Sequence, residues 1–286
     1  MKSLLTRSLL VSVIFFFTGC AGSGRQQSGK HILTTTVLPV AEFISELTGD
    51  DFIINTMVPE GMPPSVYEPT AEQLKSLGKT KLYFSLEALG FELTILRNIS
   101  SDYPEMKIIN ITQGITPISG GHKHGNKQGI DPHMWMSPKQ SVILIKNIYA
   151  ALLKYYPENK EEFSANFMQI MKKMEEVDQY VQNAIEPVKG NSFLIYHPAL
   201  SYYARDYDLV QIPIEIQGKE PSPDYLNALI GQAKQNQIQL MFIQRQFDVS
   251  FAHIVAEETG SRVIVFDPLS SAWSETIHQV TDAFKN

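Results

Sequence analysis

The chain has 286 residues, of which 43% are hydrophobic and 19% are charged. These fractions are typical of a globular protein with a sizeable core, and they exclude a disordered or membrane-embedded chain. The formal net charge of −6 argues against nucleic acid as a partner and weakly favours a cation.

The N-terminus has the order of a secretory signal. Lys2 and Arg7 precede an apolar run over residues 8–17, which ends in small residues. The run is shorter than the roughly 20 residues that cross a bilayer, so a cleaved signal over residues 1–19 is favoured over a transmembrane anchor. Cleavage makes the remaining chain more negative, and it predicts an exported protein.

Cys20 is the only cysteine, which excludes an intramolecular disulfide and a cysteine-based zinc cluster. Its position after small residues resembles a bacterial lipobox, in which the cysteine is lipidated and becomes the new N-terminus, although Phe17 replaces the usual aliphatic residue. The small polar residues that follow predict a tether over residues 20–30. We therefore expect a periplasmic or extracytoplasmic protein that is anchored to a membrane through Cys20.

From His31 onward, short β-rich runs alternate with helical stretches. Strands are predicted over residues 32–38, 52–58, 81–85 and 107–110, and helices over residues 40–47 and 70–77. This alternation predicts a parallel sheet with helices on both faces. Thr70 and Gln73 fit a capping box, which places the preceding loop at the carboxyl end of a strand, where open α/β sheets bind ligands.

Between residues 137 and 188 only helical signals occur. Ser137 and Pro138 predict the start of one helix, and Pro157 predicts a break before a longer one. We expect the stripe of Met168, Met171, Met174 and Val177 on this longer helix to face the core.

Strand and helix signals alternate again after residue 190. Strands are predicted over residues 193–196, 209–214, 239–243 and 263–266, with helices that begin near Ser201, Ser222 and Asp248. The whole pattern predicts an α/β fold with two lobes, over residues 31–157 and 189–286, joined by a long helix over residues 158–188.

Three side chains that can bind a metal follow predicted strands or lie in the loops between them. They are His133, His197 and Asp267. Their equivalent placement indicates that they converge on one crevice. Zinc accepts imidazole nitrogen and carboxylate oxygen in sites without thiolate, and manganese accepts the same set with more oxygen. Each residue alone is a weak signal, because a histidine at a strand end is often only a hydrogen-bonded core residue.

Five segments together resemble the metal-binding solute receptors of zinc and manganese ABC importers. They are, in family order, MVPEG (57–61) with YEPT (67–70), DPHMW (131–135), HPALSYYAR (197–205), GKEPSP (218–223), and ETG (258–260) with DPL (267–269). The resemblance implies two α/β lobes with parallel sheets, joined by a long rigid helix, and a metal cleft between the lobes.

The same resemblance implies a role. His133, His197 and Asp267 would bind Zn²⁺, or alternatively Mn²⁺, as a transported ligand. The protein would not be an enzyme, and it would deliver the ion to an ABC permease in the cytoplasmic membrane. We expect it to be a monomer.

Two positions depart from the family. Its first histidine usually lies just before YEPT, where this chain has Ser65. Because a hydroxyl is a poor zinc ligand, the first lobe is expected to supply a water, a nearby carboxylate such as Glu68, or no ligand. Gln244 stands in a region that often carries a carboxylate in relatives, which removes one candidate charge near the ligands.

His122 and His124 lie in a glycine-rich stretch before DPHMW, where zinc receptors of this family often carry a longer histidine-rich loop. A weak metal-gathering site and a mobile polar loop are both open, and the loop is favoured. His31, His253 and His278 have no comparable context, so we treat them as structural or surface residues.

Two alternatives to metal transport remain open. Ser65 in place of a histidine suggests a surface interaction or adhesion protein that has kept the receptor fold and weakened its metal binding. A metal-dependent hydrolase is the other, because two histidines, a carboxylate and an open position also describe a catalytic zinc site. The chain has no His-Glu-x-x-His motif, which argues against the hydrolase.

Overall fold

The computed structural model describes residues 30–64, 67–96, 98, 100–124, 127–215, 219, 221–247 and 250–285. The predicted signal, Cys20 and nearly all of the predicted tether lie outside these residues. No helix within the described ranges is both long and apolar enough to cross a membrane.

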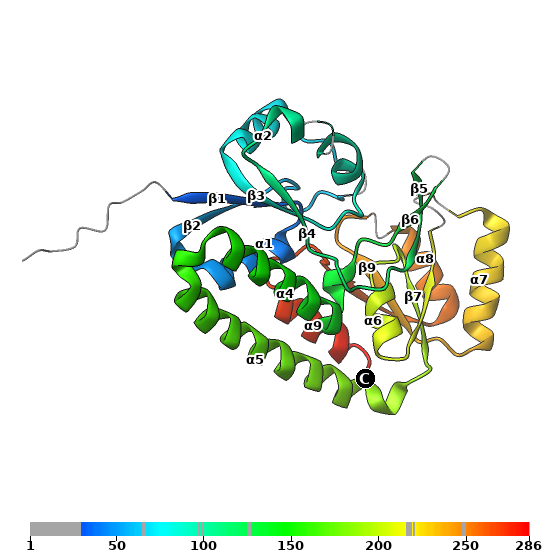
Figure 1. Cartoon of the computed structure of the whole chain (residues 1–286). Coiled ribbons are helices and arrows are strands. Elements are labelled where there is room, and N and C mark those ends of the chain that lie inside the picture. The colour runs from blue at the N-terminus through cyan, green and yellow to red at the C-terminus, as the bar shows by residue number, and fades with distance from the viewer. Residues whose placement is uncertain are drawn as a thin grey trace, which may run out of the picture.

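Two four-stranded parallel sheets form the centres of two α/β lobes, as the alternating pattern predicts (Figure 1). The first sheet has the order β2-β1-β3-β4 and consists of β1 (His31–Thr35), β2 (Phe52–Thr56), β3 (Thr80–Ser85) and β4 (Lys107–Asn110). The second sheet has the order β10-β9-β7-β8 and consists of β7 (Ser192–Ile195), β8 (Val210–Pro213), β9 (Leu240–Gln244) and β10 (Arg262–Phe266). The predicted fold class is confirmed.

Helices cover both sheets and connect them. They are α1 (Leu38–Thr48), α2 (Ala71–Ser76), α4 (Pro138–Tyr155), α5 (Lys160–Ile185), α6 (Ser201–Asp206), α7 (Pro223–Gln235), α8 (Ser250–Thr259) and α9 (Trp273–Asp282). Short 3-10 turns lie at Gly49–Asp51, Leu77–Lys79, Ser100–Asp102, Met134–Met136, Pro157–Asn159 and Glu186–Val188, and a π-helical turn at Glu92–Leu96. The long helix α5 runs along one side of the molecule, past both lobes (Figure 1).

Local sequence signals explain where several helices begin. Thr70 and Gln73 form the predicted capping box of α2, and the Ser222 hydroxyl accepts a hydrogen bond from the Tyr225 amide at the start of α7. Pro138 stands in the first turn of α4, where its missing amide hydrogen costs nothing. The Ser137 hydroxyl, however, donates to Asp206 of α6 (2.6 Å) and makes no cap.

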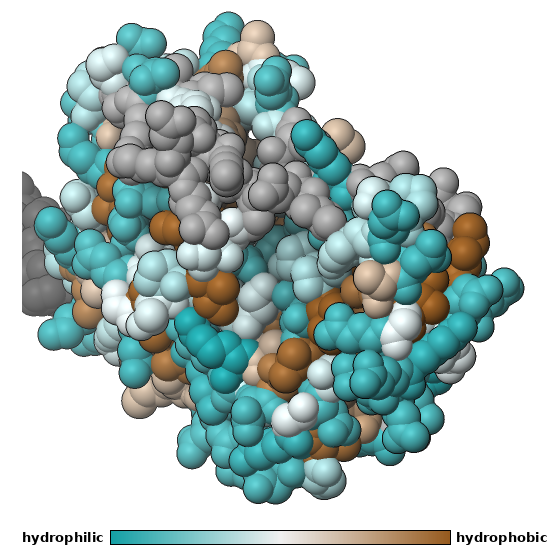
Figure 2. Space-filling model, turned by 90° about the vertical axis from the view of Figure 1, so that its right-hand side faces the viewer, coloured by the Kyte–Doolittle hydropathy of each residue, from teal (hydrophilic) through white to brown (hydrophobic). Residues whose placement is uncertain are grey.

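One hydrophobic core continues from the first lobe into the second. It includes Phe84 of the first sheet, Ile148 of α4, Val177 of α5, Phe193 of the second sheet and Trp273 of α9. Smaller clusters fill the outer face of each sheet, around Tyr83 in the first lobe and Met241 in the second. The side on which α7 lies is mostly hydrophilic with separate apolar groups, as expected for helices that bury one face (Figure 2).

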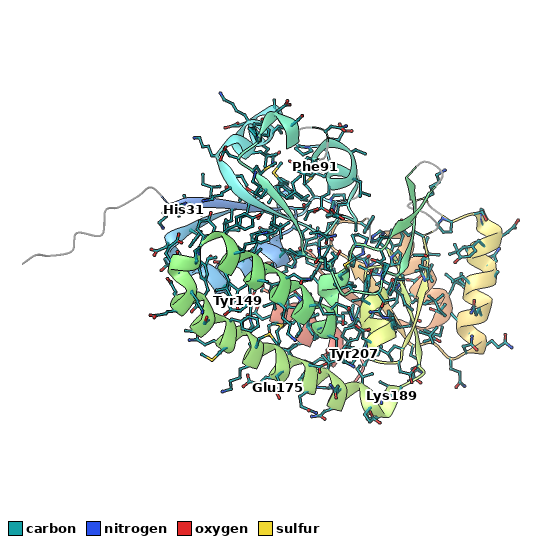
Figure 3. All side chains as sticks on the ribbon, in the orientation of Figure 1. His31, Phe91, Tyr149, Glu175, Lys189 and Tyr207 are labelled. Carbon is teal, nitrogen blue, oxygen red and sulfur yellow. The ribbon has the colours of Figure 1, made fainter. Side chains whose placement is uncertain are left out.

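Hydrogen bonds fasten α4 and α5 to the second lobe. The Tyr207 hydroxyl, labelled in Figure 3, donates to Asp178 of α5 (2.6 Å). Gln140 of α4 donates to the Asp206 carboxylate (2.6 Å). The two lobes are therefore connected by polar contacts as well as by apolar packing.

The prediction that the methionine stripe on α5 faces the core is wrong at the N-terminal end of the stripe. Met174 and Val177 are buried, but Met168 is 67% exposed. The buried face follows Phe163, Ile170, Met174, Val177 and Val181 at helical spacing, and Met168 lies off that line.

The glycine-rich stretch is not the predicted loop but an antiparallel hairpin of β5 (Ser119–His124) and β6 (Lys127–Ile130). A Cβ atom on Gly120 would lie 2.9 Å from the Asp131 amide nitrogen, so glycine permits this close approach of two backbones. The Asp131 amide also donates to the Ile118 carbonyl (2.9 Å). The hairpin therefore continues directly into the DPHMW segment, and Asp131 is still paired with the opposite strand. Of the His122 and His124 side chains nothing is described.

Candidate metal centre

Polar residues stand at the carboxyl ends of all four strands in the second sheet. His197 follows β7, Glu215 follows β8, Gln244 ends β9, and Asp267 follows β10. Because parallel strands end at the same edge, this arrangement gathers their side chains on one side of the sheet.

His133 reaches the same region from the segment between the hairpin and α4. The Asp131 carboxylate accepts hydrogen bonds from the His133 backbone amide (2.9 Å) and from its Nδ1 (2.8 Å). Burial raises the pKa of Asp131, but the neighbouring His133 and hydrogen bonds from His133 and Ser201 outweigh it and leave the pKa below its usual value. Asp131 is therefore a buried carboxylate, 4% exposed, that stays charged and orients the ring.

His197 is held from three sides. Its Nδ1 lies 2.8 Å from Oε1 of the buried Glu215. The Gln244 amide accepts from the His197 backbone N–H (3.1 Å) and donates to the His197 carbonyl (2.6 Å). Phe247 stacks on the ring, with centroids 5.4 Å apart. These contacts fix both the backbone and the ring plane.

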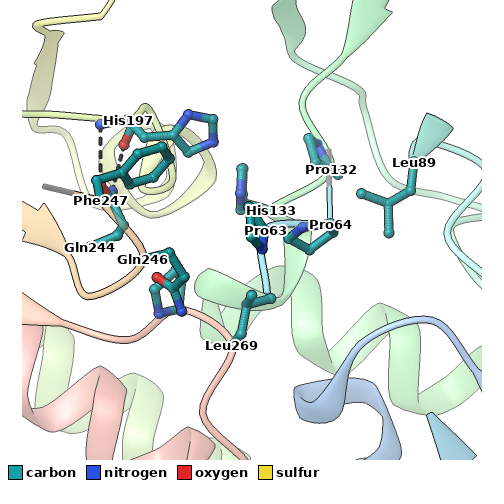
Figure 4. A pocket seen from close by; sticks show the side chains of 11 residues that line it. Pro63, Pro64, Leu89, Pro132, His133, His197, Gln244, Gln246, Phe247 and Leu269 are labelled. Atoms are coloured by element: carbon teal, nitrogen blue, oxygen red, sulfur yellow. Dashed lines mark hydrogen bonds between the residues drawn. The ribbon is translucent and has the colours of Figure 1, made fainter. Parts of the chain in front are cut away.

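The two imidazole rings lie against each other in a T-shaped arrangement, with centroids 5.2 Å apart (Figure 4). Since each Nδ1 contacts a carboxylate, we assign the proton to Nδ1 in both rings. The lone pair of each ring is then on Nε2, which is the form in which neutral histidine binds a metal.

A small pocket of about 40 Å³ contains both rings. Its other lining residues are Pro63, Pro64, Leu89, Pro132, Gln244, Gln246, Phe247, Pro268 and Leu269. The volume accommodates an ion with a few waters and is too small for an organic ligand of ordinary size. The walls are mainly apolar, which lowers the local dielectric constant and strengthens electrostatic attraction inside.

Asp267 is not among the residues that line this pocket. Its Oδ1 accepts hydrogen bonds from Gln246 Nε2 (2.6 Å) and from the Leu269 amide (2.9 Å). Within the described ranges, no three His, Cys, Asp or Glu side chains are grouped closely enough to hold a metal. The structure thus brings His133 and His197 together and leaves Asp267 apart from them.

The first lobe contributes apolar walls from the segment before YEPT. Pro63 and Pro64 line the pocket. Ser65, which occupies the expected histidine position, lies outside the described residues. Glu68 is exposed and is not among the lining residues.

Sequence reasoning missed three residues that shape the site. Glu215 could have been found, because it follows a strand just as His197 and Asp267 do. Asp131 stands two residues before His133, at the spacing of an aspartate that binds its own local backbone. Gln246 carries no such signal. Gln244, in the region where relatives often carry a carboxylate, binds the His197 backbone.

Residues 33–286 match the family described as "Zinc-uptake complex component A periplasmic" (ZnuA). The chain belongs to this family. Among solved ZnuA structures, a deletion mutant with zinc bound superposes with a TM-score of 0.82 at 32% identity, covering 90% of this chain and 98% of that one.

Curated relatives agree with the family assignment. The zinc-binding lipoprotein AdcA of Streptococcus pneumoniae is 28% identical over 279 residues, covering 93% of this chain and 56% of AdcA. The high-affinity zinc uptake system protein ZnuA of Bacillus subtilis is 24% identical, covering 89% of this chain and 83% of that protein. This chain therefore spans little more than half the length of its AdcA relatives.

Proposed function

We propose that this protein is the extracytoplasmic metal-binding component of an ABC import system, which captures Zn²⁺, or alternatively Mn²⁺, and delivers it to a permease. The observation that carries the proposal is the pair of facing imidazoles, His133 and His197, each oriented by a buried carboxylate. Two imidazole nitrogens favour zinc over manganese, because manganese prefers more oxygen. The named zinc-binding relatives support the same cargo.

In this proposal the ion binds Nε2 of both histidines, and Asp267 supplies a carboxylate oxygen. Solvent completes the coordination. Ser65 and Glu68 are the candidates for a further ligand from the first lobe. The ion is cargo, so the protein is not an enzyme, in keeping with a family of solute receptors. This sets the hydrolase alternative aside.

The placement of the protein is part of the same proposal. Cleavage after residue 19 and lipidation of Cys20 would anchor a monomer to a membrane through the tether over residues 20–30. The lobes over residues 31–157 and 189–286, with the linking helix over residues 158–188, are its proposed divisions. His122 and His124 remain candidates for a weak metal-gathering site.

Calorimetric titration of the metal-stripped protein with Zn²⁺ and Mn²⁺ tests the proposal. We expect tight one-to-one binding of zinc that is lost in His133→Ala and in His197→Ala, because each variant removes one ligand nitrogen. His278→Ala is the matched control, since His278 packs on Tyr180 and does not line the pocket. Weak binding, or binding that neither variant changes, would favour the adhesion protein instead.

A further inference from the structure

Gln246 connects Asp267 to the pocket that contains both histidines. Gln246 lines the pocket together with His133 and His197, whereas Asp267 does not. The Gln246 amide donates to Asp267 Oδ1 at 2.6 Å, a short bond to a carboxylate. The Leu269 amide donates to the same oxygen, so two hydrogen bonds hold the carboxylate in its present position.

The turn that carries Gln246 also contacts His197. Gln244 binds the His197 backbone, and Phe247 stacks on its ring. The Phe247 amide donates to the Gln244 carbonyl (3.1 Å), which closes the turn. Gln246 therefore projects from a turn that is fixed beside His197, and its amide is bound to Asp267.

We propose that Gln246 competes with the bound ion for Asp267, and that this competition sets how tightly the ion is held. This inference rests on the proposed function. An ion between His133 and His197 that recruits Asp267 through Oδ1 must displace the Gln246 amide from that oxygen. The Gln246 amide thus lowers the affinity for the ion, which suits a receptor that must release its cargo.

Zinc affinity in four forms of the full chain tests this competition. The forms are the unmodified protein, Gln246→Ala, Asp267→Ala and the double variant, titrated with Zn²⁺ against a chromophoric chelator. Gln246→Ala is expected to tighten zinc binding roughly tenfold, because a hydrogen bond to a charged group no longer opposes coordination. In the Asp267→Ala background the same substitution is expected to change nothing.

A matched control and a structural readout accompany the titration. Gln279→Ala removes an amide that donates to the Val265 carbonyl and does not line the pocket, so zinc affinity should stay unchanged. Crystal structures of the metal-free and zinc-loaded protein are expected to show the Gln246 Nε2 to Asp267 Oδ1 distance lengthen on loading.

Other outcomes of the zinc titrations would contradict the competition or the proposed function. Weaker or unchanged zinc binding in Gln246→Ala overturns the competition, and weaker binding would make Gln246 a support for ligation. Tightening that persists in the Asp267→Ala background also overturns it. Failure of the unmodified protein to bind zinc would instead reject the proposed function itself, so the two failures are distinguishable.

Discussion

A buried carboxylate orients each of the two histidine rings. Glu215 touches His197 Nδ1 from the end of β8, and Asp131 does the same for His133. Without such a partner a ring can rotate and change its tautomer, and both changes weaken metal binding.

Glu215→Ala is expected to weaken zinc binding by about 10-fold to 100-fold, because it removes the acceptor that fixes the His197 ring. Glu215→Gln should lose less, since its amide oxygen can still accept the Nδ1 proton. Titration of both variants against a competing chelator measures the difference. Glu105→Ala, at an exposed position, is the control; equal losses in the alanine and glutamine variants would contradict the orienting role.

Glu92 links stability to pH. It is 2% exposed and accepts hydrogen bonds from Thr36 and from the Leu86 and Ala88 amides. Burial raises its pKa above the ordinary value of 4.5, although these hydrogen bonds lower it in part. Folding therefore favours the protonated form, so the Glu92 contribution is fully present below pH 4.5 and declines as the pH rises through the raised pKa.

Urea unfolding at a series of pH values can detect this decline. The reference is Glu92→Gln, whose side chain does not titrate. The unfolding free energy of the unmodified protein, taken relative to this variant, is expected to fall as the pH rises above 4.5. A difference that stays constant with pH would show that Glu92 keeps its ordinary pKa.

At the scale of elements, the hairpin of β5 and β6 depends on one close backbone approach. Gly120→Ala would place a Cβ atom 2.9 Å from the Asp131 amide nitrogen, so the hairpin or the His133 segment must move. We expect a lower melting temperature and weaker zinc binding, measured by calorimetry. Gly231→Ala, on α7 with no atom within 4 Å of the new Cβ, should stabilise by about 0.5–1 kcal/mol. Similar effects of the two substitutions would refute the close-approach argument.

Elements with a strong period or a cap could be predicted from the sequence. The strand over Lys107–Asn110 and the α2 capping box are both found where expected. The first strand ends earlier than predicted, at Thr35, because α1 already begins at Leu38 with Pro39 in its first turn. The hairpin was missed because glycine, lysine and histidine give no alternation of apolar and polar residues.

The candidate site was predictable only in part. His133 and His197 could be named because their neighbours in the chain carry the family motifs, and parallel strands bring such ends together. The position of Asp267 relative to the pocket depends on the Gln246 side chain, which comes from another strand end. No periodicity in a single sequence encodes such a side-chain pair, so Asp267 as a ligand stays a prediction.

At the scale of the whole molecule, Trp135 and Trp273 connect segments that are far apart in the chain. The Trp135 indole donates to the Pro268 carbonyl (2.7 Å), and the Trp273 indole donates to the Trp135 carbonyl (2.6 Å). Trp273 also packs on Phe43 of α1. The last helix is thereby fixed to the first lobe, although it follows the second sheet in sequence.

We expect the metal-free protein to unfold in one cooperative transition, because a single core includes residues of both sheets. Zinc at a hundredfold excess over its Kd should raise the unfolding free energy by about 2.7 kcal/mol. Differential scanning calorimetry with and without zinc checks both statements. Two separate transitions in the metal-free protein would show that the lobes fold independently.

The size of the pocket would also limit the chemical form in which the proposed zinc cargo enters. The pocket has walls of proline, leucine and phenylalanine that pack on a shared core. It offers no space for an ion that is still coordinated by citrate, amino acids or a peptide. Such carriers would have to release the ion before it enters the pocket. The protein would then sort metals by how readily they exchange their former partners as well as by how strongly they bind.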